Sequence, residues 1–477
     1  MQFVSTRGQA PALSFSDAVL TGLARDGGLY VPESWPQIGS DEIAAFATQA
    51  YPAIAERVIS PFVGDEFPPG VLAGMIGTAY ASFRHPSVTP LVELGVSRYV
   101  LELFHGPTLA FKDVAMQLLA QMMDHILKQR GARATIVGAT SGDTGSAAIE
   151  AFRGRGNIDV FILHPYGRTS EVQRRQMTTV LDGNVHNIAL KGTFDDCQAV
   201  VKGLFNNHRF RDRVALSGVN SINWGRIVAQ IVYYFKAAAQ LGAPAQTVDF
   251  SVPTGNFGDI FAGYAAKRMG LNIGRLLIAT NENDILARTL ATGRYETAGV
   301  TPTISPSMDI QVSSNFERLL FEALGRDAAA VERLMASLAQ SGHFEIPAEA
   351  LARIRADFSA GRVSEEQTRD TMRRVHELSA YVLDPHTAVG VAAAERQLGR
   401  AEAGAPSFNT ATENPVVMLA TAHPAKFPAA VKTATGVEPG LPLWLADLYS
   451  RAERYDVLEN DQSAVEAYVS ASSRAAG

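Results

Sequence analysis

The chain has 477 residues and a formal net charge of −6, a length that predicts about two to four domains with a sizeable core. Its pI near 6.0 argues against a nucleic-acid binder or an anionic-membrane binder, because both need a basic surface. A single cysteine, Cys197, excludes a disulfide framework and a cysteine-based zinc site, and we predict no metal site. The sequence shows no signal-peptide pattern and no apolar run of membrane-spanning length, so we expect a soluble cytoplasmic protein.

Short apolar runs alternate with helix-like segments from Tyr99 onward. We expect strands at 99–103, 134–138, 160–163, 185–190, 247–252, 275–280 and 415–420, and helices at 112–129, from about 144, and near 170–179. The strands are rich in Val, Ile and Leu without clean alternation, which is typical of parallel strands covered on both faces. These features predict an α/β fold with open, mostly parallel sheets, whose ligands bind at the carboxyl ends of the strands.

The strand–helix rhythm is not uniform along the chain. Residues 1–95 lack it and predict a separate N-terminal domain. We expect a large ligand-binding domain from 96–128 and 245–477, with a charged helical insertion at about 316–378. Residues 129–244 then form a smaller α/β domain.

Lys112 stands in the segment FHGPTLAFKDVA (104–115), where a helix is expected to begin among apolar neighbours. One interpretation is an ordinary lysine whose ammonium reaches water. The other is a partly desolvated amine whose lowered pKa suits covalent chemistry with a carbonyl.

Two loops share one design, in which a strand leads through Gly, Ser, Thr or Asn into a helix. They are GATSGDTGS (138–146) and VPTGNFGDIFAGY (252–264). Converging backbone N–H groups at a helix N-terminus bind anions, although each loop can also be a tight turn with a helix cap. A third segment, NPVVMLATAHPAKF (414–427), ends a strand at Thr421. A lysine, two anion loops and a strand-end hydroxyl together fit pyridoxal 5'-phosphate, which needs an amine, a phosphate cradle and a partner for its ring nitrogen.

These motifs resemble the threonine synthase family, of the longer bacterial and fungal type, within the fold-type II pyridoxal-phosphate enzymes. The resemblance spans nearly the whole chain and includes FVSTRG (3–8), GLARDGGLYVPE (22–33), NSINWGR (220–226) and DPHTAVG (384–390). It implies two open, mostly parallel sheets with helices on both faces, like the β subunit of tryptophan synthase, plus the N-terminal domain and the helical insertion.

The resemblance also implies roles for individual residues. Lys112 would form a Schiff base with the cofactor and act as general base, Thr421 would face the ring nitrogen, and Asp143 would lie beside the ring oxygen. A carboxylate at that position needs a proton or a nearby cation. The implied cofactor-phosphate residues are Gly255, Asn256, Phe257 and Gly258, and the implied residues for the substrate carboxylate are Ser141, Gly142 and Thr144.

The implied reaction converts O-phospho-L-homoserine and water into L-threonine and phosphate by β,γ-elimination and replacement, which is the last step of threonine biosynthesis. The enzyme would be a carbon–oxygen lyase acting on phosphates, either a monomer or a homodimer. We expect the substrate phosphate to bind Ser221, Asn223 and Arg226, with Lys426 as a further candidate. The alternative for Arg226 is a structural ion pair. His105 and His386 could also lie near the site, although a lone histidine is more often structural than catalytic.

Two other functions remain possible from the sequence. The first is another enzyme on the same scaffold, such as a serine/threonine dehydratase or a phospho-lyase, which would yield a keto acid and ammonia. The second is a non-catalytic protein that binds small phosphorylated metabolites and uses Lys112 as a point charge.

Overall fold

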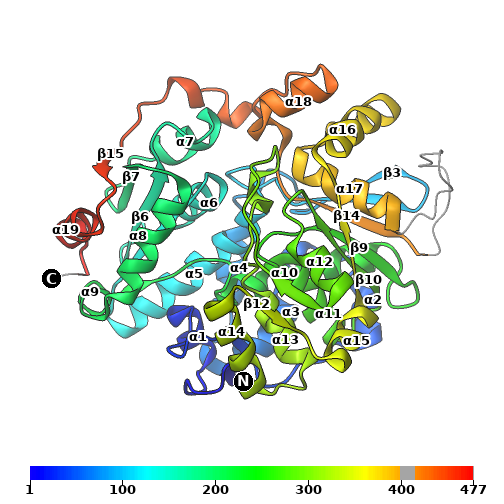
Figure 1. Cartoon of the computed structure of the whole chain (residues 1–477), viewed down its shortest axis with the longest axis horizontal. Coiled ribbons are helices and arrows are strands. Elements are labelled where there is room, and N and C mark those ends of the chain that lie inside the picture. Colours follow the sequence, from blue (N-terminus) through cyan, green and yellow to red (C-terminus); the bar gives the residue numbers. More distant parts are fainter. Residues whose placement is uncertain (398–413, 476–477) are drawn as a thin grey trace.

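The computed structural model describes residues 1–397 and 414–475, arranged around two sheets that lie side by side (Figure 1). The strand order of the larger sheet is β13 (Phe358–Arg362), β10 (Ile273–Thr280), β9 (Val248–Pro253), β14 (Val416–Ala420), β4 (Arg98–Glu102) and β3 (Leu91–Gly95). Only the β3–β4 pair of this sheet is antiparallel among the described strands. The smaller sheet is parallel, with the order β15 (Asp456–Glu459), β7 (Val185–Lys191), β6 (Ile158–Pro165), β5 (Ala134–Ala139) and β8 (Leu216–Ser217).

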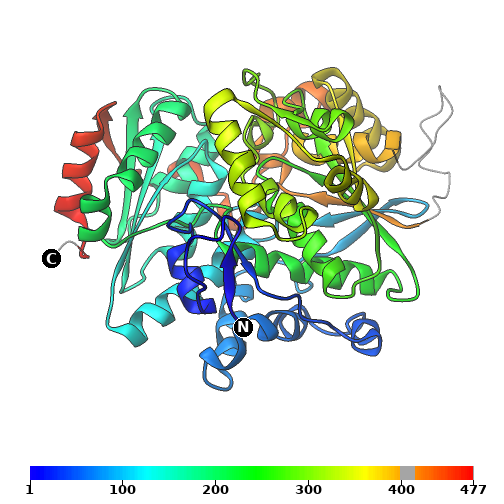
Figure 2. The same cartoon turned by 60° about the horizontal axis from the view of Figure 1, so that its bottom comes forward.

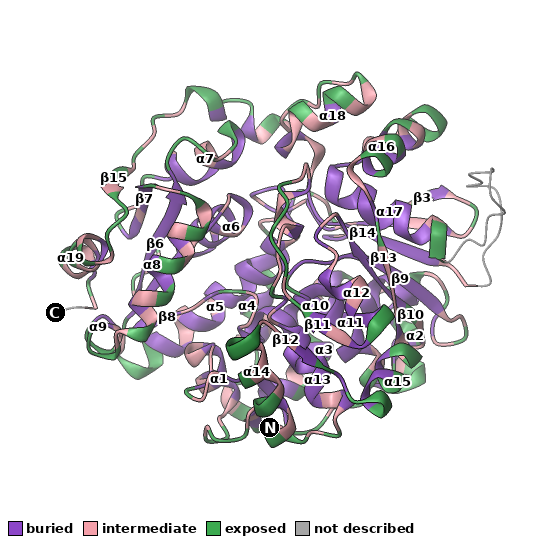
Figure 3. Cartoon of the chain, viewed as in Figure 1, coloured by how far each residue is buried: buried purple, intermediate pink, exposed green. Residues whose placement is uncertain are grey.

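Both faces of the larger sheet are buried, because successive side chains of a strand point to opposite faces. Leu276, Ile278, Val417 and Leu419 join the core formed with α10 (Trp224–Gln240) and α11 (Gly258–Arg268). The alternate residues of the same strands pack in a second core with α17 (Pro385–Gln397). Parallel strands covered on both faces are therefore confirmed, and Figure 3 shows the strands buried and the outer helices exposed.

Helix α5 (Lys112–Arg130) joins the two sheets. It packs against α10 on the side of the larger sheet and against α6 (Asp143–Phe152) on the side of the smaller sheet. The other face of the smaller sheet is covered by α8 (Phe194–Asn206) and α19 (Gln462–Ser472). The remaining helices of this part are α7 (Glu171–Thr178) and α9 (His208–Arg213).

The N-terminal region lies below the two sheets (Figure 2), and its apolar side chains join the same core as those of α5, α10 and α11. β1 (Phe3–Ser5) pairs with β2 (Tyr30–Pro32), and the helices are α1 (Phe15–Thr21), α2 (Ser40–Ala45), α3 (Tyr51–Val63) and α4 (Val71–Tyr80). The insertion after β10 contains α12 (Ile285–Thr292), β11 (Arg294–Glu296), α13 (Phe316–Ala323), α14 (Ala328–Ser341), β12 (His343–Glu345), α15 (Ala348–Asp357) and α16 (Glu365–Ser379). The last helix before the C-terminal segment is α18 (Pro428–Thr435).

Two segments lie elsewhere than the predicted domain boundaries place them. β15 pairs with β7, so the strand and helix at residues 456–472 belong to the smaller sheet and not to the 245–477 portion of the large domain. Helix α10, which falls in the predicted 129–244 unit, packs on α11 and α3 instead. β15 is an edge strand of mixed, mostly exposed residues, so it has no buried apolar run that a sequence pattern would reveal. No helix in the described residues is long and apolar enough to cross a membrane.

Candidate active site

Three neighbouring parallel strands bring the predicted lysine, glycine loop and threonine to one edge of the larger sheet. In the order β9-β14-β4, β9 leads to residues 255–258, β14 ends just before Thr421, and β4 leads into the loop that carries Lys112. The Phe111 backbone N–H donates to the Thr421 carbonyl oxygen at 2.8 Å, which ties the last two segments together. The carboxyl ends of parallel strands are the usual ligand site of such sheets.

Lys112 is the first residue of α5, and only 9% of it is exposed. Burial lowers the pKa of the Lys112 amine, and although the Asp143 carboxylate opposes this shift, the charges of Lys426 and Arg226 reinforce it. The Nζ atom lies 4.8 Å from the centre of the Phe111 ring and 3.7 Å from Asp143 Oδ2. The structure therefore favours the desolvated amine over a lysine that reaches water.

Asp143 begins α6 after β5 and is held from three directions. Lys426 Nζ lies 2.8 Å from Asp143 Oδ1, Gln173 Nε2 donates to the same oxygen at 2.8 Å, and Lys112 approaches Oδ2. Burial alone would raise the pKa of the Asp143 carboxyl, but the ammonium groups of Lys426 and Lys112 hold it well below its usual range. The cation that this carboxylate needs is thus Lys426, whose side chain is 0% exposed.

The backbone of the 141–144 loop is held by the side chains of neighbouring residues. The Thr140 hydroxyl oxygen accepts hydrogen bonds from the N–H groups of Gly142 and Gly145, both at 2.9 Å. Gly142 has φ +151°, and a Cβ there would lie 2.4 Å from the Gln173 side chain. Ser141 and Thr144 are half-buried beside Asp143, at the N-terminus of α6, where backbone N–H groups favour an anion.

The 255–258 loop is anchored through its carbonyl groups. Ser313 Oγ donates to the Gly255 oxygen at 2.6 Å, and Asn315 donates to the Asn256 oxygen from its backbone N–H at 3.1 Å and from Nδ2 at 2.9 Å. The Asn256 side chain itself is exposed.

Phe257 takes the left-handed conformation, with φ +65°, at the start of α11. Its ring is fully buried against Phe316 and Phe358, so packing holds a backbone conformation that costs a non-glycine residue free energy. The first turn of α11 therefore begins at a fixed position, and the charge of Asp259 in that turn acts on Lys112.

The 220–226 segment adjoins this loop, but its three candidates differ. The Asn223 side chain is occupied: it caps α10 by accepting from the Gly225 N–H at 2.9 Å and donates to the Val19 oxygen at 2.8 Å. Ser221 Cβ lies 3.7 Å from the position of a Cβ built on Gly258. Arg226 is 2% exposed, and burial lowers the pKa of its guanidinium to about 10.

Arg226 also lacks an ion-pair partner among the described residues. Its NH1 donates to the Val219 oxygen at 3.3 Å, and its Nε has no partner in that part of the chain. A buried, unpaired guanidinium is costly without an anion, so this position fits an anionic ligand better than the structural ion pair that was the alternative.

Two contributors, Ser307 and Gln173, have no motif in the sequence, and the sequence predicts His386 only as a possible neighbour. Ser307 Oγ donates to Asp143 Oδ2 at 3.3 Å, its N–H donates to His386 Nε2 at 3.2 Å, and its carbonyl oxygen lies 2.7 Å from the position of a Cβ on Gly255. Gln173 takes part in the site through its hydrogen bond to Asp143. His386 has Asp384 on Nδ1 at 2.9 Å, so it positions Ser307. His105 pairs instead with Glu102 at 2.7 Å.

Comparison with known proteins finds three family models along the chain. Family models match residues 2–80 (threonine synthase N terminus), 83–334 (pyridoxal-phosphate dependent enzyme) and 387–469 (threonine synthase, C-terminal). The threonine synthase of Pseudomonas aeruginosa is 52% identical, over 98% of this chain and 98% of that protein.

Solved structures agree with these matches. The pyridoxal-phosphate-bound threonine synthase of Brucella melitensis is 59% identical and superposes with a TM-score of 0.94, covering 99% of this chain and 100% of that chain. The yeast threonine synthase has a TM-score of 0.91 at 39% identity, covering 99% of this chain and 98% of that chain.

Proposed function

The chain belongs to the threonine synthase family of pyridoxal-phosphate-dependent lyases, and from that premise we propose that it converts O-phospho-L-homoserine and water into L-threonine and phosphate. The observation that carries the proposal is the buried Lys112 amine, which faces an ionised Asp143 and stands between two helix N-termini suited to anions. The cofactor is pyridoxal 5'-phosphate.

The residues at the strand ends fit this cofactor. Lys112 offers a desolvated amine for its aldehyde. The 255–258 loop offers a phosphate cradle at the start of α11, where a Cβ on Gly255 would collide with the Ser307 oxygen. The Thr421 hydroxyl has no partner among the described residues and is therefore available to the ring nitrogen. When bound, pyridoxal phosphate supplies an electron sink next to the substrate α-carbon.

Lys112 would perform the proton transfers. It would hold the cofactor covalently and, as a free neutral amine, would accept the α-proton of the substrate; after giving up that proton it would accept a β-proton. Its lowered pKa favours the neutral amine that a general base needs. Asp143, kept ionised by Lys426, would fix the ammonium of Lys112 when that residue carries the proton, and would lie on the ring-oxygen side of the cofactor.

The substrate would be held by its two anionic ends. The backbone N–H groups of residues 141–144 would bind its carboxylate, as expected at the N-terminus of α6. Arg226 and Ser221 would bind its phosphate, because the buried guanidinium has no other anion nearby and Ser221 adjoins Gly258. Asn223 and Lys426 are already occupied by the α10 cap and by Asp143, so the proposal for the phosphate no longer rests on them.

The decisive experiment measures phosphate release from O-phospho-L-homoserine and identifies the amino-acid product in the same reaction. Lys112→Ala should lower the rate by at least about 10³-fold, because it removes both the covalent anchor and the base. Lys128→Ala, an exposed lysine of the same helix, is the matched control and should leave the rate unchanged.

The products decide between the alternatives. Threonine and phosphate in equal amounts, lost only in Lys112→Ala, support the proposal. Phosphate with a keto acid would identify a phospho-lyase, a keto acid without phosphate release would fit a dehydratase, and no turnover with retained phosphate binding would fit a non-catalytic binder.

A second experiment tests the substrate-phosphate residues. Arg226→Gln should lower kcat/KM by about 10²-fold or more, since it removes a charge-assisted contact to the leaving phosphate. Inorganic phosphate should raise the melting temperature of the wild type and have a weaker effect on the variant. An unchanged kcat/KM would refute the assignment of Arg226.

Location and assembly also belong to the proposal. Cys197 is a buried free thiol, which supports a reducing cytoplasm. A monomer or a homodimer remains the prediction, and sedimentation equilibrium would distinguish the two.

A further inference from the structure

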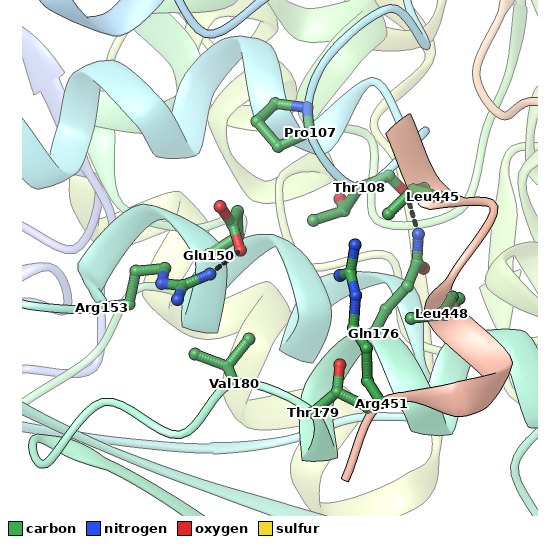
Figure 4. Close-up of a pocket in the computed structure, with 10 residues that line it drawn as sticks. All are labelled: Pro107, Thr108, Glu150, Arg153, Gln176, Thr179, Val180, Leu445, Leu448 and Arg451. Atoms are coloured by element: carbon green, nitrogen blue, oxygen red, sulfur yellow. Dashed lines mark hydrogen bonds and ion pairs between the residues drawn. The ribbon is translucent and has the colours of Figure 1, made fainter. Parts of the chain in front are cut away.

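A cavity of about 340 Å³ lies behind the active site, between the smaller sheet's helices and the C-terminal segment (Figure 4). Its floor is Thr108 and Gln176, and its charged rim is Glu150, Arg153 and Arg451. The apolar side is formed by Pro107, Val180, Leu445 and Leu448, the last two from the short 3₁₀ helices η4 (Leu443–Leu445) and η5 (Leu448–Ser450). None of these residues belongs to the site described above.

The floor of the cavity holds an unsatisfied polar atom. Gln176 is 6% exposed, and its Nε2 donates to the Thr108 oxygen at 3.1 Å. Its Oε1 has no hydrogen-bond partner among the described residues. Buried polar atoms are rarely left unpaired, so a small turn of this amide toward the cavity would give the oxygen the donor that it lacks.

The charges of the rim are of both signs. Arg153 NH1 lies 3.2 Å from Glu150 Oε2, and its NH2 also pairs with Asp182 at 2.8 Å. Arg451 lies close enough to Glu150 to interact with its charge, but its own partner is Asp447 at 2.6 Å, whose side chain is 65% exposed. Such an exposed ion pair contributes little, so the Arg451 guanidinium can exchange Asp447 for another carboxylate at little cost.

A zwitterion matches this arrangement. Its ammonium has two acceptors, the Glu150 carboxylate and Gln176 Oε1, and its carboxylate has the Arg451 guanidinium. The Glu150 carboxylate would repel a simple anion, and the two arginines would repel a simple cation. The buried side chains of Val180, Leu445 and Leu448 accept a short aliphatic group, and the volume is that of a small-metabolite site.

We propose that this cavity is a regulatory binding site for a small aliphatic α-amino acid. Its carboxylate binds Arg451, its ammonium binds Glu150 and Gln176, and its side chain packs on Val180, Leu445 and Leu448. Figure 4 shows these groups converging from α6, α7, the 107–108 loop and the C-terminal segment.

Thr108 connects the cavity to the active site. Its carbonyl oxygen accepts from Gln176 in the cavity and from Lys426 Nζ at 2.8 Å. Its N–H and hydroxyl donate to Asp113, the neighbour of Lys112, at 2.8 and 2.7 Å. Helix α7 also carries Gln173, which holds Asp143. A ligand that moves Gln176 therefore acts on residues that position Lys112 and Asp143, and the effect must be reciprocal in binding free energy.

The test uses the holoenzyme and L-valine as the probe, with isothermal titration calorimetry as the readout. L-Valine should bind the wild type, whereas isobutylamine and 3-methylbutyrate, which lack the carboxylate and the ammonium respectively, should bind at least about tenfold more weakly. The visible absorption of the cofactor should show that it stays attached to Lys112 at saturation, because the ligand binds outside the active site.

Variants locate the binding. Arg451→Gln and Glu150→Gln should each weaken L-valine binding about tenfold or more. Arg373→Gln is the matched control, since Arg373 also pairs with a carboxylate four residues away, at 3.0 Å, on the distant helix α16. No heat of binding with the wild type, or binding that these cavity variants leave unchanged, would overturn the proposal.

A second readout tests the connection through Thr108. L-Valine should change the KM for O-phospho-L-homoserine at least threefold in the wild type and not in Arg451→Gln. Binding with an unchanged KM would overturn the regulatory part. Because L-valine binding is measured without turnover, its failure is distinguishable from a failure of the proposed reaction.

Discussion

The two strand–loop–helix segments of the site look alike in sequence but differ in their electrostatics. Each places an aspartate in the first turn of its helix, Asp143 in α6 and Asp259 in α11, and both carboxyls are buried. Asp143 has two lysines beside it and a pKa held well below its usual range. Burial raises the pKa of Asp259 to about 6, because no cation in the described residues lies within ion-pair distance.

This difference separates two kinds of anion site. Beside the 255–258 loop, Arg226 has no ion-pair partner among the described residues, so its charge is available to the substrate phosphate that we propose it binds. In the 141–144 loop the lysine charges are paired with Asp143, so the loop would offer only backbone N–H groups to the substrate carboxylate. Similar backbones can therefore suit different anions, because their side-chain charges differ.

Removal of Lys426 should give the largest change in stability. Lys426→Met leaves the buried Asp143 carboxylate with Lys112, at 3.7 Å, as its remaining cationic partner among the described residues. The variant should lower the free energy of unfolding by about 3–5 kcal/mol. It should also raise the pKa of Lys112, which reduces the neutral amine and the activity at neutral pH. Urea unfolding and the pH–rate profile measure the two effects.

Two comparisons sharpen that result. Lys432→Met, which removes an exposed lysine paired with Glu438, should cost at most about 1 kcal/mol. The double variant Lys426→Met/Asp143→Asn should recover most of the lost stability, because the buried carboxylate is gone and burial favours the neutral form of Lys112. A double variant as unstable as Lys426→Met would mean that packing of the lysine, not its charge, holds this loop.

The pH dependence of stability should run in opposite directions for the two aspartates. The folded-state pKa of Asp259 is raised from 3.8 to about 6, so the protonated acid stabilises the fold below pH 3.8, and that contribution is lost as the pH rises through 6. Relative to Asp259→Asn, the wild type should lose up to about 3 kcal/mol over this window. The pKa of Asp143 is lowered, so its contribution is present above pH 3.8 and is lost as the pH falls.

Urea unfolding of the cofactor-free protein between pH 4 and 7 measures both curves. The free energy of unfolding of the wild type minus that of Asp259→Asn should fall with rising pH. The corresponding difference for Asp143→Asn should not fall over the same range. Parallel curves would show that the two buried carboxyls have the same protonation state.

The sequence predicts the buried parts of this fold well. The observed β5, β7, β10 and β14 lie within two residues of the expected strands, because each is an apolar run covered on both faces. The edge strand β13 falls in the insertion expected to be helical, and the residues of β15 are largely exposed. Edge strands need only one partner, so they lack the apolar signal that marks a central strand.

The site shows the same limit. Lys112, the two loops and Thr421 follow strand ends, so their position can be predicted from local pattern. The Ser307–Asp143 hydrogen bond joins residues 164 positions apart, and nothing local to Ser307 indicates it. The hydrogen bond from the Asn223 amide to the Val19 oxygen cannot be predicted from local sequence either, since Val19 lies in the N-terminal region.

Two glycines of one loop should respond differently to alanine. A Cβ on Gly255 would lie 2.7 Å from the Ser307 backbone oxygen, whereas a Cβ on Gly258 would have no neighbour nearer than 3.4 Å. Gly255→Ala should therefore lower the stability of the cofactor-free protein by about 1–3 kcal/mol, and Gly258→Ala should be nearly neutral. Thermal unfolding measures both, and equal melting temperatures would contradict the close contact with the Ser307 segment.

The smallest effect is expected at Thr421, which we propose contacts the cofactor ring. Thr421→Val keeps the shape but removes a hydroxyl with no partner among the described residues, so the cofactor-free protein should keep its stability. Pyridoxal phosphate should bind about 3- to 10-fold more weakly, as for one lost neutral hydrogen bond, while Thr421→Ser should bind nearly as the wild type does. An absorbance titration measures the affinities. If Thr421→Ser binds as weakly as Thr421→Val, the methyl group and not the hydroxyl is what the ring contacts.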